Sequence, residues 1–178
     1  MPSCDPRDAP VGNVSAALLV IDSRLRAVYD GKTGTDPEEQ RMLEEAVASF
    51  SPAEARAVLE GVCTLVYLYM NWLSKAFAEH EEDVVEHVVP SLVATMRMMP
   101  RTFRPEVVPT MAGLLTAAGT GLSPTLWRAQ YGPWTEEEMN PLEATAVLLA
   151  EYVNRISGKG NDFATTLVSD VLSKAEQD

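Results

Sequence analysis

Cysteine is scarce in this sequence, which contains only Cys4 and Cys63. Two cysteines cannot form the dense disulfide framework of a small secreted protein, and a chain of 178 residues buries enough surface to fold without one. Cys63 lies within an apolar helical pattern, so we expect it to be a small core residue. The first residues also lack the apolar segment of a secretory signal. These features predict a protein of a reducing compartment, by default the cytoplasm.

Positive charge is scarce as well. The chain has 14 Lys and Arg against 26 Asp and Glu, which gives a net charge of -12 and a pI of about 4.6. Such a chain repels phosphate backbones and anionic lipid, so we expect no nucleic-acid and no membrane partner. The apolar stretch 61–74 has no charged residue, but it is shorter than the ~20 residues that a membrane-spanning helix needs. We interpret it as part of a buried helix.

The motifs of common catalytic and metal sites are absent. The sequence has no GxSxG nucleophile motif, and its two histidines, His80 and His87, form no HExxH zinc motif because Val84 stands at the second histidine position. His80, Asp83 and His87 share a predicted helix face, but the acids beside them are also the residues that favour a helix N-terminus. We therefore predict no catalytic residue, no metal ligand and no cofactor, and an enzyme is the less favoured reading.

Helical periodicity is what the sequence has in abundance. Apolar residues recur at helical spacing, and the breaks between them carry helix-capping signals rather than hairpin turns. The pattern predicts an all-α, single-domain bundle of seven to nine helices over residues 13–178, after a disordered or extended segment 1–12. Ser51 with Pro52 and Glu54 marks a helix start. The helix over about 52–78 is apolar on nearly all sides, so it should lie at the bundle centre or in a dimer seam.

Two short matches raise the hypothesis of an internal duplication with two-fold pseudo-symmetry. Residues 51–59 and 140–148 are identical at six of nine positions, at an offset of 89 residues, which is half of the chain length. Residues 33–37 resemble residues 120–124 at an offset of 87. Recurring helix-start signals explain the shared Pro and Glu without duplication, although they do not explain the AxAVL that follows. Both interpretations stay open at this point.

Candidate ligand or partner residues gather in a proline-broken region and in an aromatic turn. Pro90 should kink or divide a helix, and further prolines interrupt residues 100–109. Methionines there could line an adaptable apolar pocket or fill the core. Arginines there could bind an anionic ligand or an acidic partner helix, or could pair with the chain's own acidic helix starts. Aromatic residues of the turn could form an interface or close the bundle end. The candidates are Met96, Met99, Phe103, Met111, Trp127, Trp134, Arg101 and Arg104.

These observations favour a cytoplasmic helical protein that acts as a regulator or accessory factor by binding other proteins and that self-associates. One alternative is a binder of a small apolar molecule, with a pocket of methionine and aromatic residues between helices. The other is an enzyme that uses carboxylates without a recognisable motif. A pocket near residues 96–111 would favour the small-molecule binder, and a buried two-fold contact would favour self-association.

Overall fold

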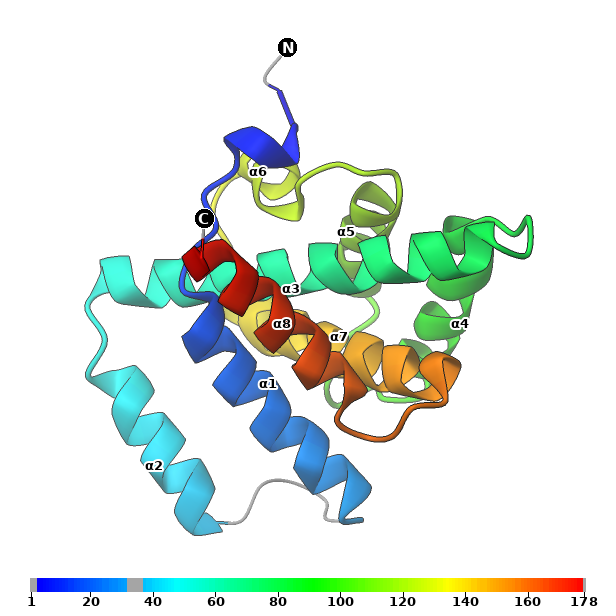
Figure 1. The fold of residues 1–178 in the computed structure, drawn as a ribbon. Coiled ribbons are helices and arrows are strands. Elements are labelled where there is room, and N and C mark those ends of the chain that lie inside the picture. Colours follow the sequence, from blue (N-terminus) through cyan, green and yellow to red (C-terminus); the bar gives the residue numbers. More distant parts are fainter. Residues whose placement is uncertain (1–2, 32–36, 178) are drawn as a thin grey trace.

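The computed structural model describes residues 3–31 and 37–177, apart from the side chains of residues 39, 40, 43 and 47. Within this part the chain forms one 3-10 turn and eight α-helices and no strand, which confirms the predicted all-α bundle (Figure 1). The elements are η1 (Pro6–Asp8), α1 (Val14–Tyr29), α2 (Pro37–Ala48), α3 (Pro52–Ala78), α4 (Val84–Arg97), α5 (Val108–Gly119), α6 (Pro124–Ala129), α7 (Glu136–Ser157) and α8 (Phe163–Gln177).

Several helices begin where the capping signals of the sequence place them. The Ser51 hydroxyl accepts a hydrogen bond from the Glu54 backbone N–H at 3.2 Å, and the Ser123 hydroxyl accepts one from the Leu126 N–H at 3.1 Å. A proline follows each serine in the first helical turn, where its missing N–H costs nothing. Local sequence therefore sets the starts of α3 and α6.

Helix α3 lies at the centre of the bundle, as its apolar sequence predicts. It packs against α1, α4, α5, α6, α7 and α8, and in Figure 1 it runs across the whole molecule. At 1.5 Å per residue its 27 residues span about 40 Å. Its buried side chains form the middle of one continuous core, and they are Val62, Cys63, Leu65, Val66, Tyr69, Met70 and Leu73.

Two prolines lie inside helices. Of the two effects expected at Pro90, a kink or a division, the division does not occur, because α4 continues through Pro90 from Val84 to Arg97. Pro141 likewise lies inside α7. The Thr145 hydroxyl donates a hydrogen bond of 2.7 Å to the Pro141 carbonyl oxygen and so binds this part of the helix to the next turn.

The two matching segments of the suggested duplication take different positions in their helices. Ser51 is the N-cap of α3, whereas Asn140 lies inside α7, after a start at Glu136. Pro37 and Pro124 both begin a helix, but residues 33–36 of the second match lie outside the described part. The shared residues therefore do not mark equivalent helix starts in the longer match, and duplication stays a prediction.

The N-terminal segment lies against the bundle. The Cys4 carbonyl oxygen accepts a 2.8 Å hydrogen bond from the Ser123 N–H, and the Val11 carbonyl oxygen accepts one of the same length from the Thr64 hydroxyl. At Gly61 a Cβ atom would lie 2.4 Å from the Asn13 carbonyl oxygen. Glycine at position 61 is therefore what allows the segment to pass so close to α3.

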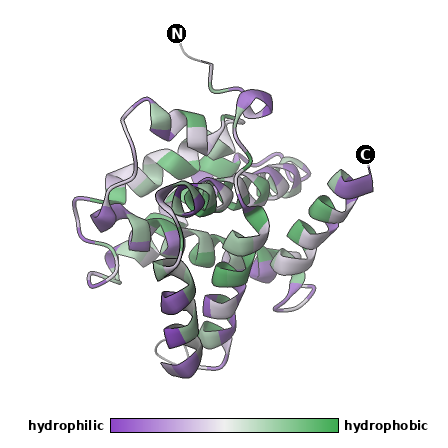
Figure 2. Ribbon diagram, turned by 90° about the vertical axis from the view of Figure 1, so that its left-hand side faces the viewer, coloured by the Kyte–Doolittle hydropathy of each residue, from purple (hydrophilic) through white to green (hydrophobic). Residues whose placement is uncertain are grey.

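Helix α3 is the one described helix long and apolar enough to cross a membrane by length and composition. The core helix of a globular protein meets the same criterion, and the side chains of α3 named above are buried against six other helices. Figure 2 shows hydrophilic residues prevailing in the loops, with hydrophobic residues concentrated where the helices pack. The structure thus gives no strong signal of a membrane protein.

Candidate functional site

The structure places the predicted methionine cluster in the core. Met96 and Met111 are completely buried and Phe103 is 1% exposed, while Met99 is half-buried and packs against the same core. None of these four residues lines any of the cavities described below. The core-filling interpretation therefore holds for this cluster, and the cavity of interest lies at the aromatic turn.

Trp127 also has a structural role. Its ring lies against Gly113 of α5, where a Cβ atom would come within 2.9 Å of the indole. The Trp127 ring also contacts the ring of the exposed Tyr131, with the ring centroids 5.4 Å apart. Trp127 therefore joins α6 to α5, and the missing side chain of Gly113 makes room for it.

Arg128 fixes the loop that follows α6. Its guanidinium donates two hydrogen bonds to the Glu138 carboxylate, at 2.6 and 2.7 Å, and two more to the carbonyl oxygens of Gly132 and Pro133, at 3.1 and 2.8 Å. The two charged side chains are only 10% and 13% exposed. The Arg128 guanidinium also lies 4.3 Å from the centre of the Trp134 ring, which is cation–π distance. The ion pair thus holds Trp134 in place.

The Glu138 carboxylate is a stable anion in this arrangement. Its hydrogen bonds with Arg128 lower its pKa below the ordinary value, and partial burial offsets only part of that effect. The same carboxylate accepts a hydrogen bond of 3.0 Å from the Thr135 N–H at the start of α7. One side chain therefore connects α6, the loop and α7.

A cavity of about 650 Å3 lies between the first half of α3, α6 and this loop. We call it the Trp134 cavity. Its lining is mostly apolar, with the indole of Trp134 on one side and the thioether of Met139 at the start of α7. The lining residues are Pro52, Ala55, Arg56, Leu59, Glu60, Cys63, Thr125, Arg128, Ala129, Gly132, Pro133, Trp134 and Met139.

Cys63 lies at the inner wall of the Trp134 cavity. Burial raises the pKa of its thiol to about 12, and the nearby Thr125 hydroxyl and Trp134 indole N–H offset only part of the rise. The thiol is therefore neutral at physiological pH and is no nucleophile. Cys63 and Thr125 also line a second cavity of about 300 Å3 below the N-terminal segment, so these two residues form the shared wall.

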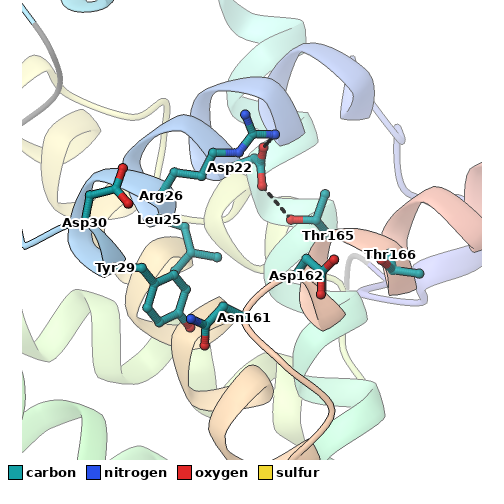
Figure 3. A pocket seen from close by; sticks show the side chains of 9 residues that line it. All are labelled: Asp22, Leu25, Arg26, Tyr29, Asp30, Asn161, Asp162, Thr165 and Thr166. Atoms are coloured by element: carbon teal, nitrogen blue, oxygen red, sulfur yellow. Dashed lines mark hydrogen bonds and ion pairs between the residues drawn. The ribbon is translucent and has the colours of Figure 1, made fainter.

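A third, polar pocket of about 490 Å3 lies between the end of α1 and the start of α8 (Figure 3). The Asp22 carboxylate accepts a hydrogen bond from the Thr165 hydroxyl at 2.8 Å and forms an ion pair with Arg26 at 2.6 Å. Near this pocket, the buried Asn154 amide donates one hydrogen bond to the Tyr29 hydroxyl, at 3.0 Å, and one to the Asn161 carbonyl oxygen in the loop before α8. These polar groups form hydrogen bonds and an ion pair with one another, and these interactions attach α8 to α1 and α7.

The two histidines have other neighbours than the metal-ligand pattern considered in the sequence. In the described part of the chain no three His, Cys, Asp or Glu side chains lie close enough together to hold a metal ion. His87 instead stacks on Phe77, with ring centroids 5.7 Å apart. Asp83 is the N-cap of α4, and its carboxylate accepts a hydrogen bond from the Val85 N–H at 2.8 Å.

The predicted arginine candidates are exposed. Arg101 and Arg104, with Arg97 at the end of α4, form no ion pair with any described residue. One interpretation of these arginines is that they pair with the acidic residues at the chain's own helix starts. The described part of the chain shows no such ion pair. They lie apart from the Trp134 cavity, whose lining contains neither of them.

Sequence reasoning found Trp134 but missed Arg128, Glu138 and Met139. Glu138 has an adequate local explanation as a first-turn acid, and only the fold shows that Arg128 turns inward to meet it. Fold and cavity together define an all-α bundle with an apolar cavity, and the Trp134 ring that forms one side of this cavity contacts the guanidinium of the Arg128–Glu138 ion pair. Comparison of the chain with known protein families, curated proteins and solved structures gives no match.

Proposed function

We propose that this protein binds a small, uncharged and predominantly apolar molecule in the Trp134 cavity. The observation that supports this most is that an apolar cavity of about 650 Å3 is walled by an indole ring that a nearly buried ion pair holds in position. Ligand cavities typically measure about 300–1,000 Å3 and are mainly apolar with a few placed polar groups. A wall that is fixed before binding lowers the entropic cost of binding.

The lining favours an uncharged ligand. Arg128 already makes four hydrogen bonds to protein oxygens, and Glu60 pairs with Arg56 at 3.4 Å. A charged ligand would have to displace one of these partners. The Trp134 ring offers a flat surface, and Met139 offers a flexible thioether that adapts to different shapes. Together they suit a ring-containing hydrophobic molecule.

Binding rather than catalysis is proposed because the reactive group of the lining is inactive. The Cys63 thiol is the strongest nucleophile by type in the cavity, yet its pKa of about 12 keeps it protonated at neutral pH. The one carboxylate among the lining residues, Glu60, forms an ion pair with Arg56. Both cysteines are free thiols, which supports the proposed location in the cytoplasm.

A fluorescence titration with N-phenyl-1-naphthylamine, a neutral aromatic probe, tests the proposal. We expect saturable binding by the wild-type protein. Ala129→Phe places a ring in the cavity from an exposed position of α6, so it should weaken probe binding by at least about tenfold, or about 1.4 kcal/mol. The matched control is Ala94→Phe, at an exposed position of α4.

The control separates the cavity from general surface hydrophobicity. Ala94→Phe should bind the probe as the wild type does, and circular dichroism should show both variants folded. Undiminished binding by Ala129→Phe, equal losses in the two variants, or no saturable binding by the wild type would each overturn the proposal.

A further inference from the structure

The arginines of this chain divide into two groups. Seven of the ten form an ion pair with a described carboxylate, and the three that do not are close in sequence, at the end of α4 and in the turn that follows it. The unpaired arginines are Arg97, Arg101 and Arg104, and all three are exposed. In a chain with a net charge of -12, carboxylates are not in short supply. Three arginines left unpaired in one place therefore point to a partner from outside the chain.

An exposed methionine lies among these arginines. Met98 is 82% exposed, more than any other large hydrophobic side chain among the described residues. Met and Arg are enriched in protein interfaces. Met supplies adaptable apolar contact, and Arg supplies hydrogen bonds to carboxylates. Residues 97, 98, 101 and 104 are called the arginine surface below.

We propose that the arginine surface binds helix α2 of a second copy of this chain. Helix α2 is acidic, with four glutamates and one arginine among its twelve residues. Glu38, Met42 and Glu45 follow one another at spacings of four and three residues and so lie on one helical stripe. All three are exposed, Met42 by 63%. This stripe of Glu, Met and Glu complements an arginine surface with an exposed methionine among its arginines.

The surroundings of α2 fit this role. In the described part of the chain no other helix packs along α2, whereas the remaining helices pack against one another. Arg41 pairs with Glu45 only at 4.0 Å, with both side chains about 70% exposed, and pairs this long and exposed contribute little. Glu45 can therefore exchange Arg41 for an arginine of the second copy.

The start of α7 is a weaker candidate for the same role. Glu136 and Glu137 are exposed there, but Glu138 is already bound to Arg128 and no large apolar side chain lies between exposed glutamates as Met42 does in α2. Figure 1 shows α2 and α4 at opposite sides of the bundle. The interface therefore joins two different surfaces, and each copy offers both.

Sedimentation equilibrium tests the inference at an ionic strength of about 0.15 M, where the Debye length of about 8 Å screens the general repulsion between acidic copies more than direct contacts. The wild type should show a weight-average mass above the monomer mass of 19.4 kDa that rises with concentration. The variants R101E/R104E and E38K/E45K should each have the monomer mass. In either variant the arginine surface and helix α2 carry charges of the same sign and repel each other.

Mixing the two monomeric variants is the decisive step. The first keeps α2 intact and the second keeps the arginine surface intact, so an equimolar mixture should again exceed the monomer mass. The control E136K/E137K should associate as the wild type does. A monomeric wild type, variants that still associate, a mixture that stays monomeric, or loss of association in the control would each overturn the proposal. Circular dichroism checks that all variants are folded, and probe binding at the Trp134 cavity should be unchanged in them.

Discussion

The ion pair between Arg128 and Glu138 allows the most direct test of how the loop is held. In Glu138→Gln the side chain keeps its size and one carbonyl oxygen, but it loses its charge. Arg128, which is 8% exposed, then keeps its positive charge without a counter-charge. Removing one partner of a buried ion pair typically costs about 3–5 kcal/mol, because the other charge is left uncompensated.

The expected loss for Glu138→Gln is somewhat smaller than this range. The glutamine oxygen can still accept one of the two hydrogen bonds that Arg128 donates, and both side chains keep slight contact with water. We therefore expect the free energy of unfolding to fall by about 2–3 kcal/mol. For a chain of this length that corresponds to a decrease in Tm of roughly 5–10 °C.

Urea unfolding followed by circular dichroism measures the effect, with Glu137→Gln as the matched control. Glu137 is the exposed neighbour in the same first turn, so its substitution should change stability by no more than about 1 kcal/mol. Because Arg128 lowers the pKa of Glu138, the stabilisation is present above the ordinary pKa of 4.5 and is lost as pH falls through the lower, folded-state value. The difference between wild type and Glu138→Gln should thus shrink in acid.

Two outcomes would refute this reasoning. One is a Glu138→Gln variant within about 0.5 kcal/mol of the wild type at neutral pH, which is the range of an ordinary surface substitution. The other is a difference that grows rather than shrinks in acid. Probe binding should also weaken in Glu138→Gln, because the Trp134 ring loses the fixed guanidinium beside it.

Three further perturbations probe other contacts. Asn154→Ala removes a buried amide that bonds to Tyr29 and to the start of α8, so we expect a loss of about 3 kcal/mol and faster amide hydrogen exchange in α8. Gly61→Ala should displace the N-terminal segment at a cost of about 1–3 kcal/mol, visible as faster proteolysis of residues 3–13, and unchanged cleavage would contradict it. In the native protein iodoacetamide should label Cys4 but not Cys63, and mass spectrometry should find the second adduct only after unfolding.

The parts of the fold that sequence predicts are those that depend on near neighbours. Ser51 caps α3 through a residue three positions away, and the core position of α3 follows from apolar residues on nearly all its sides. Such effects act within one or two turns of helix. Val171 shows the limit, because its helical spacing predicts an inward position, yet near the end of α8 it is 40% exposed.

The candidate site could be predicted only in part. A side chain that lines a cavity and one that fills a core occupy the same face of a helix, so periodicity could not tell Met96 from Met139. The pairing of Arg128 with Glu138 joins two helices and depends on the path of the loop between them. The sequence places Arg97, Arg101 and Arg104 close to Pro100, but only the folded chain shows that they form no ion pair with a described residue.

The central position of α3 determines how cooperatively the molecule unfolds. Six helices pack against α3, so each of the six loses buried surface when α3 unfolds. The bundle should therefore unfold in a single cooperative transition, with denaturation curves that coincide for different spectroscopic signals. Helix α2 is the exception among the described helices, because it has no such shared face and an isolated helix of its length is marginal in water. It can melt and reform while the rest of the molecule stays folded.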